Sequence, residues 1–126
     1  MVRKSSLILI LFLPSLALAA EDWWNNTWQY RVPINVSSES YARQDMPVEL
    51  IINFTDLLDN LNDSDTFDDN SIRIIESGFE IPSQFDEIST GYGELIWIAN
   101  GTTSSLTNRS YFIYFDTDNN AKTDKV

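Results

Sequence analysis

The sequence predicts an all-β protein, an antiparallel β-sandwich of about six to seven strands with an immunoglobulin-like or jelly-roll-like arrangement. Apolar and polar residues alternate with a period of two over residues 28–36 and 46–54, as in strands that bury one face. Further short apolar segments follow at close spacing between turn residues, and little of the chain has a helical pattern. About 100 residues remain once an N-terminal leader is set aside, which suits a sandwich of this kind.

The strands are predicted in chain order from these patterns. In the first, residues 28–36, Pro33 falls on the outer face and indicates an edge strand, because proline donates no ladder hydrogen bond. Residues 46–54 repeat the alternation, with Ile51 interrupting the polar face. Residues 56–62 fit one or two helical turns, with Thr55 or Asp56 as N-cap.

The second half of the chain continues the strand pattern. Residues 71–76 and 80–86 are extended, with a turn at Ser77-Gly78 between them, and 87–93 are expected to form a loop. Residues 94–100 and 109–116 are continuous apolar runs, which predicts strands covered on both faces.

The N-terminus has the order of a cleavable signal peptide. Arg3 and Lys4 are followed by an apolar run, and Ala17-Leu18-Ala19 fits the small-residue pattern for cleavage. The apolar run, 7–20, would rise only about 21 Å as a helix, too short for a hydrocarbon core of about 30 Å. We therefore predict a signal peptide at 1–20, a β-sandwich domain at 21–118 and a polar tail at 119–126, with no transmembrane segment in the mature chain and a secreted or cell-surface location.

Composition narrows the possible chemistry. The chain has 8 basic and 19 acidic residues, with neither histidine nor cysteine. If Arg3 and Lys4 leave with the leader, the net charge becomes −13, which disfavours nucleic acid and anionic lipid as partners. Without histidine and cysteine, the usual zinc sites and the common histidine-activated nucleophiles are excluded. No arrangement of the other residues predicts a catalytic site, so we expect the domain not to be an enzyme.

Two acidic segments are candidates for cation binding. Asp116, Asp118, Asn120 and Asp124 occupy positions 1, 3, 5 and 9 of a calcium-loop spacing, with the Lys122 carbonyl at position 7. Ala121 stands where glycine is expected, and the alternative is a solvated acidic tail. The second segment contains Asp63, Asp65, Asp68 and Asp69 without loop spacing, and a solvated loop is the favoured interpretation there. Calcium is the only cofactor the sequence suggests.

Six Asn-x-Ser/Thr sequons are predicted glycosylation sites in a host that N-glycosylates exported protein, an archaeon or a eukaryote. The expected number in a chain of this composition is about two, and glycosylation requires an exposed position. Asn35 and Asn53 fall on the outward phase of their strands, and the others lie in or beside loops. The six positions are Asn25, Asn35, Asn53, Asn62, Asn100 and Asn108.

Trp23, Trp24 and Trp28 crowd the start of the predicted mature chain. Aromatic rings of this kind pack on the apolar faces of sugar rings, so Trp23 and Trp24 are candidate glycan-contacting residues. The alternative is that Trp28 belongs to the core and the other two pack across a sheet edge.

Several segments in order carry a resemblance to a known class of module. They begin with Trp28, Tyr30-Arg31 and Pro33-Ile34, and continue with the runs at 71–76, 80–86, 94–98 and 109–116. Together they resemble the N-terminal β-sandwich modules of large archaeal and bacterial exported surface or polysaccharide-related proteins. The resemblance implies an accessory role and supplies no catalytic residues.

Two functional hypotheses follow. The first is a non-catalytic extracytoplasmic module, structural or adhesive, that contacts surface glycans or other surface-layer proteins. The second is the N-terminal accessory fragment of a secreted carbohydrate-active enzyme whose catalytic domain lies elsewhere. The DNA downstream of Val126 distinguishes them, since only the second requires the reading frame to continue.

Overall fold

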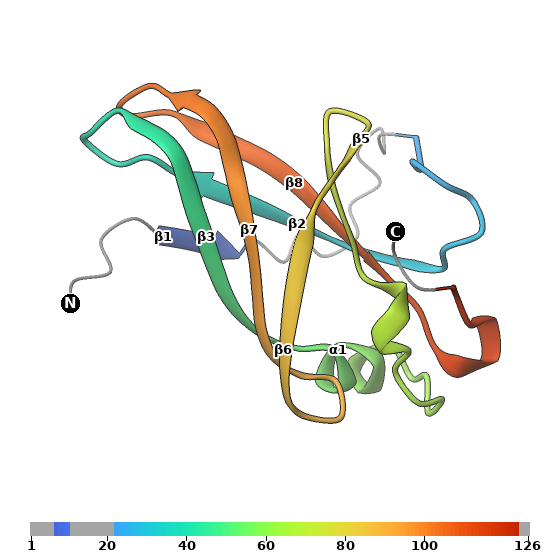
Figure 1. Ribbon diagram of the computed structural model, residues 1–126. Helices are drawn as coiled ribbons and strands as arrows, with labels where there is room; N and C mark the ends of the chain where they lie inside the picture. The colour runs from blue at the N-terminus through green and yellow to red at the C-terminus, as the bar shows by residue number, and fades with distance from the viewer. Residues whose placement is uncertain (1–6, 11–21, 124–126) are drawn as a thin grey trace.

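The structure is a computed structural model that describes residues 7–10 and 22–123. It confirms the β-sandwich: two antiparallel sheets pack face to face, and a short helix lies at the end of the second sheet (Figure 1). The strand order is β1-β2-β8-β4-β5 in the first sheet and β3-β7-β6 in the second.

The first sheet contains β1 (Leu7–Ile10), β2 (Tyr30–Ser37), β4 (Arg73–Glu76), β5 (Phe79–Ile81) and β8 (Asn108–Phe115). The second contains β3 (Arg43–Asn53), β6 (Ser83–Ser89) and β7 (Tyr92–Thr103). The helix α1 (Phe54–Asn60) follows β3 directly, and two short 3₁₀ helices span Asp69–Ser71 and Asp118–Asn120.

The core lies between the sheets and is built from alternate residues of each strand, as the period-two pattern predicts. On β3 the inward positions are Met46, Val48, Leu50 and Ile52, all buried, while Ile51 is 52% exposed. The facing sheet contributes Val32, Ile34, Val36, Tyr111, Ile113 and Phe115. Pro82 separates β5 from β6, so the chain passes from one sheet to the other within a single residue.

Three predictions about elements were wrong. The helix begins earlier than expected, and its N-cap is Asn53, whose Oδ1 accepts a hydrogen bond from the Asp56 amide at 3.0 Å. Residues 87–93 are not a loop, because β6 and β7 extend toward each other and leave a tight turn at Thr90-Gly91. The strand β7 is covered on one face only, since Ile98 on its outer face is 40% exposed.

The predicted signal peptide lies mostly outside the described residues. Its residues 7–10 form β1, which pairs antiparallel with β2 in a register from Leu7 opposite Ser37 to Ile10 opposite Ile34. In a chain that has lost this segment, β2 would be an edge strand, as Pro33 predicts. Among the described residues, no helix is long and apolar enough to cross a membrane.

Candidate functional site

The outer face of the first sheet carries a second hydrophobic cluster, separate from the core. Residues 22–29 cross this face before the chain enters β2. Trp28 packs there against Ile75 of β4 and Tyr114 of β8, with Trp24 and Phe112 beside them. The face therefore has apolar cover, which explains why the outward residue Tyr114 is only 1% exposed.

Hydrogen bonds and ring contacts fix this N-terminal segment. The Trp24 amide donates to the Tyr114 hydroxyl at 2.7 Å, and the Trp28 indole Nε1 donates to the Ser71 carbonyl at 2.7 Å. The rings of Trp24 and Trp28 lie 5.1 Å apart between centroids. Trp24 is thus held through its backbone amide and Trp28 through its indole nitrogen.

Arg31 of β2 completes the surface on the other side of β8. Its guanidinium carbon lies 4.2 Å from the ring centroid of Phe112 and 4.6 Å from that of Trp23, distances at which a cation interacts with an aromatic face. Arg31 also donates through Nη1 to the Tyr114 hydroxyl at 3.2 Å. The Arg31 guanidinium thus holds Trp23, which is 38% exposed, against β2.

Next to this cluster lies a groove of about 470 Å³ on the outer face of β8 and β4. Its apolar part comes from Trp24, Ile75, Phe112 and Tyr114, and its polar rim from Asp22, Ser77, Gly78 and Ser110. The volume falls within the range of about 300–1,000 Å³ typical of small-ligand sites, and an apolar floor with a few polar groups is their usual composition. This groove is the candidate functional site.

The structure separates the three N-terminal tryptophans. Trp24 lines the groove, Trp23 stacks on Arg31 beside it, and Trp28 is buried at 9% exposure, in the second cluster and not between the two sheets. Sequence reasoning missed Phe112 because 109–116 is a continuous apolar run, and it missed Ile75 because Ile74 and Ile75 are adjacent and the sequence does not say which of them faces outward. The one available signal was Ser110, a polar residue two positions before Phe112 and hence on the same face of β8.

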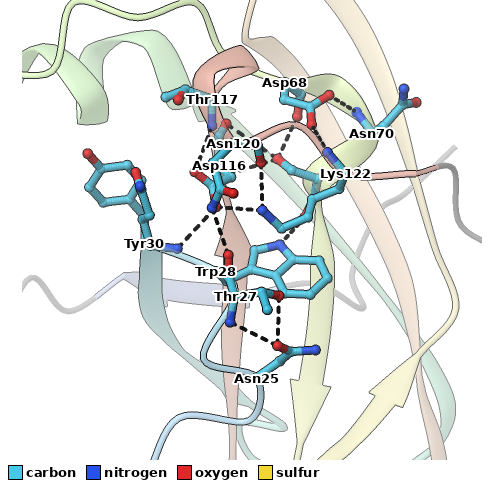
Figure 2. Close-up of polar contacts among 12 residues, drawn as sticks. Asn25, Thr27, Trp28, Tyr30, Asp68, Asn70, Asp116, Thr117, Asn120 and Lys122 are labelled. Atoms are coloured by element: carbon cyan, nitrogen blue, oxygen red, sulfur yellow. Dashed lines mark hydrogen bonds and ion pairs between the residues drawn. The ribbon is translucent and has the colours of Figure 1, made fainter.

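Asp116, the first of the predicted calcium ligands, forms an ion pair with the ammonium group of Lys122. The Asp116 carboxylate is fully buried and accepts hydrogen bonds from Lys122 Nζ at 2.9 Å and Asn120 Nδ2 at 2.7 Å (Figure 2). Its other donors are the Gln29 and Thr117 amides. Asp118 is exposed in the 3₁₀ helix, and Asp124 lies outside the described residues. The Lys122 ammonium therefore occupies a position that the calcium hypothesis assigns to a metal.

Residues 119–123 make specific contacts with the rest of the domain, although Asn119, Ala121 and Thr123 are exposed. Lys122 Nζ lies 4.9 Å from the Trp28 ring centroid, and the Arg73 guanidinium carbon lies 5.2 Å from the same ring. Arg73 also donates to the Thr123 carbonyl at 3.0 Å. Contacts with the sandwich therefore continue past residue 118, to Lys122 and Thr123.

The second acidic segment is used for local structure. Asp68 accepts hydrogen bonds from the Asn70 amide at 3.0 Å and the Lys122 amide at 2.8 Å, while Asp63 accepts one from the Tyr30 hydroxyl. That hydrogen bond raises the pKa of Tyr30 to about 12 and lowers the pKa of the Asp63 carboxyl. Within residues 7–10 and 22–123, no group of three or more acidic side chains is placed to hold a metal ion.

None of the six sequon asparagines is buried: Asn62, Asn100 and Asn108 are exposed, and Asn25, Asn35 and Asn53 are half-buried. The half-buried three each use Oδ1 as an acceptor, from Thr27, Ser110 and the Asp56 amide respectively. A glycan attaches to Nδ2, so these hydrogen bonds leave the modified atom outside the contact.

Comparison of the chain with protein-family models, with curated proteins and with solved structures finds no match in any of the three.

Proposed function

We propose that this chain is a non-catalytic, extracytoplasmic module of a secreted or cell-surface protein, which binds carbohydrate in the groove on the outer face of β8 and β4. The observation that carries the proposal is the composition of that groove: aromatic and aliphatic side chains form its floor, and Asp22, Ser77 and Ser110 stand at its rim.

Carbohydrate fits this composition better than other small ligands. A pyranose ring has an apolar C–H face, which packs on an aromatic ring, and hydroxyl groups at its edge, which need hydrogen-bond partners. Phe112 and Trp24 supply the first kind of contact and the rim supplies the second. Buried hydroxyls without partners would be costly, so both parts of the groove are required for binding.

Charge favours a neutral sugar. The mature chain would carry a net charge of −13, and Asp22 stands at the rim of the groove itself. A like charge on the ligand would be repelled over distances of about 10 Å at ordinary salt. We therefore expect neutral glycans rather than uronic-acid or sulfated polymers.

A glycan array tests the proposal, with residues 21–126 produced in a host that does not N-glycosylate. The discriminating variant is Ser110→Tyr, which fills the groove from an exposed strand position; Thr102→Tyr on β7 is the matched control, exposed on the other sheet. We expect binding of at least one neutral glycan, lost in Ser110→Tyr and kept in Thr102→Tyr. A folded domain that binds no glycan, or a Ser110→Tyr variant that binds normally, would contradict the proposal.

An activity screen on the bound glycan belongs to the same experiment. We expect binding without turnover, as for an accessory or adhesive module. Turnover that disappears when one aspartate or glutamate is replaced would overturn the non-catalytic part of the proposal and leave the groove assignment intact.

A further inference from the structure

One glycosylation sequon lies directly beside the groove. Asn35 is on β2 opposite Ser110 of β8, and the Ser110 hydroxyl donates to Asn35 Oδ1 at 2.9 Å. Ser110 also lines the groove, and Phe112 is the next outward residue on the same strand. Asn35 is therefore separated from the apolar part of the groove by only one residue, Ser110.

The other half-buried sequons do not share this placement. The Asn25 side chain bonds to Thr27 at 2.7 Å, and Asn53 caps α1 through the Asp56 amide at 3.0 Å. Neither Thr27 nor Asp56 lines the groove. Asn35 is thus bonded to the groove rim, whereas Asn25 and Asn53 are bonded to residues away from it.

The orientation of the Asn35 amide suits modification. Its Oδ1 accepts the hydrogen bond from Ser110, and a carried sugar would be bonded to Nδ2, the other branch of the same amide. The anomeric carbon of the first sugar is bonded directly to that nitrogen, and Ser110 and Phe112 are the outward residues of β8 opposite Asn35 and Pro33, so a short saccharide can fold back over them. A ligand tethered beside a groove occupies it at high effective concentration.

We propose that Asn35 carries an N-linked glycan whose first sugars lie on Phe112 and fill the groove, so that glycosylation closes the groove to free carbohydrate. In the modification, a bond forms from Nδ2 to the anomeric carbon of a lipid-pyrophosphate-linked saccharide. The bond from that carbon to pyrophosphate breaks, and Nδ2 loses one proton. The inference rests on the proposed function, because it uses the same affinity of the groove for a sugar ring.

The experiment compares the sequon variant Ser37→Ala in two hosts. Ser37 is the third residue of the Asn35 sequon, so the variant prevents glycosylation and leaves the Asn35 side chain in place. Thr102→Ala, which removes the Asn100 sequon on β7, is the matched control. All three proteins are made in an N-glycosylating eukaryotic host and in a host that does not glycosylate. Peptide mass mapping first establishes which asparagines carry sugar.

In the glycosylating host, we expect the wild type and Thr102→Ala to carry sugar on Asn35 and to bind the array glycan at least tenfold more weakly than Ser37→Ala. In the other host, all three should bind equally. A bare Asn35 in the wild-type protein, or equal binding by glycosylated wild type and Ser37→Ala, would overturn the inference.

A second measurement keeps this inference separate from the proposed function. If no free glycan binds, the proposed function fails, but packing of the tethered sugar remains measurable as a melting temperature. We expect glycosylated wild type to melt about 4 °C above glycosylated Ser37→Ala, with the difference at least halved when both carry Phe112→Ser. A difference that Phe112→Ser leaves unchanged would show that the glycan does not lie on the groove, and would contradict the inference on its own.

Discussion

The ion pair between Asp116 and Lys122 is deeply buried, with side-chain exposures of 0% and 9%. Removing the lysine leaves a carboxylate in a site closed to water. We expect Lys122→Met to lower the free energy of unfolding by about 3 kcal/mol, because an unpaired buried charge is strongly destabilising. Urea denaturation at neutral pH measures the change.

The control for this variant is Asp118→Asn, which alters an exposed carboxylate in the same segment and should change stability by less than about 0.5 kcal/mol. The double variant Asp116→Asn with Lys122→Met should lose less than the two single variants added together. If Lys122→Met is as stable as Asp118→Asn, Lys122 does not neutralise Asp116, and the calcium hypothesis for this loop regains its place.

The hydrogen bond from Tyr30 to Asp63 predicts a pH dependence at both ends of the scale. The pKa of Tyr30 rises from 10.0 to about 12 on folding, so the stabilisation is complete below pH 10 and is lost as the pH rises toward 12. The Asp63 pKa is lowered from 3.8, so its stabilisation is present above that pH and is lost as the pH falls through the lowered value. Unfolding curves between pH 2 and 12 should show both losses.

In Tyr30→Phe, we expect a smaller decrease in the free energy of unfolding between pH 10 and pH 12. The phenolate absorbance that Tyr30 contributes near pH 12 should also be absent. Tyr41→Phe is the control, since Tyr41 is 69% exposed. Equal pH profiles for wild type and Tyr30→Phe would show that the hydrogen bond does not form in solution.

Among the elements, the β6–β7 hairpin depends on one glycine. Gly91 has φ +78°, and a Cβ there would lie 2.3 Å from Thr55 Oγ1 and 3.1 Å from the Thr55 amide. Gly78, in the β4–β5 turn, has φ +85° with open space around it. We expect Gly78→Ala to cost about 1–2 kcal/mol, for backbone strain alone, and Gly91→Ala to cost about 1–3 kcal/mol more because of the clash.

Thermal or urea unfolding of both variants measures this difference, and Gly91→Ala combined with Thr55→Ala should recover part of it. Similar losses in the two single variants would mean that α1 moves away from the hairpin without cost.

The strands show what the sequence could and could not predict. In β2 and β3, alternation identified the buried face correctly, because a strand with one solvated face has a period of two in its sequence. For β8, the pattern is a continuous apolar run, since the N-terminal segment covers the outer face. Which outward residues line a groove then depends on where Trp24 lies, and local sequence does not specify that placement.

The helix and the acidic loop illustrate the same limit. Asn53 is the last residue of β3 and the N-cap of α1. The alternating pattern predicted its outward orientation but not its capping hydrogen bond. The calcium hypothesis used the backbone carbonyl of Lys122, whereas in the structure its side-chain ammonium bonds to Asp116. The ammonium also lies over the ring of Trp28, a contact between distant parts of the sequence that local spacing does not predict. Spacing placed Asn120 beside Asp116 correctly but did not indicate the bond from the Lys122 ammonium, and calcium binding by this loop stays a prediction.

At the scale of the whole molecule, cleavage of the predicted signal peptide would change which strand edges the sandwich exposes. We predict that the exported product begins at Ala20 or Glu21, which removes β1 and leaves β2 as an edge strand. N-terminal sequencing of secreted protein measures the cleavage site, and Ala19→Leu should impair processing, because the site accepts only small side chains. A secreted product that retains Met1 would contradict the prediction.

The pairing of β2 with β8 also determines when β2 can join the sheet during synthesis. Asn35 lies opposite Ser110, which is 75 residues later in the chain, so β2 has no β8 partner until nearly the whole domain has been synthesised. Closing a loop of that length precedes any gain from the sheet, and such non-local pairing folds slowly. If the chain is exported while it is made, as we predict, it remains unfolded until β8 has emerged. That delay would give a glycosylating enzyme access to Asn35 before β8, which pairs with β2 beside it, has been made.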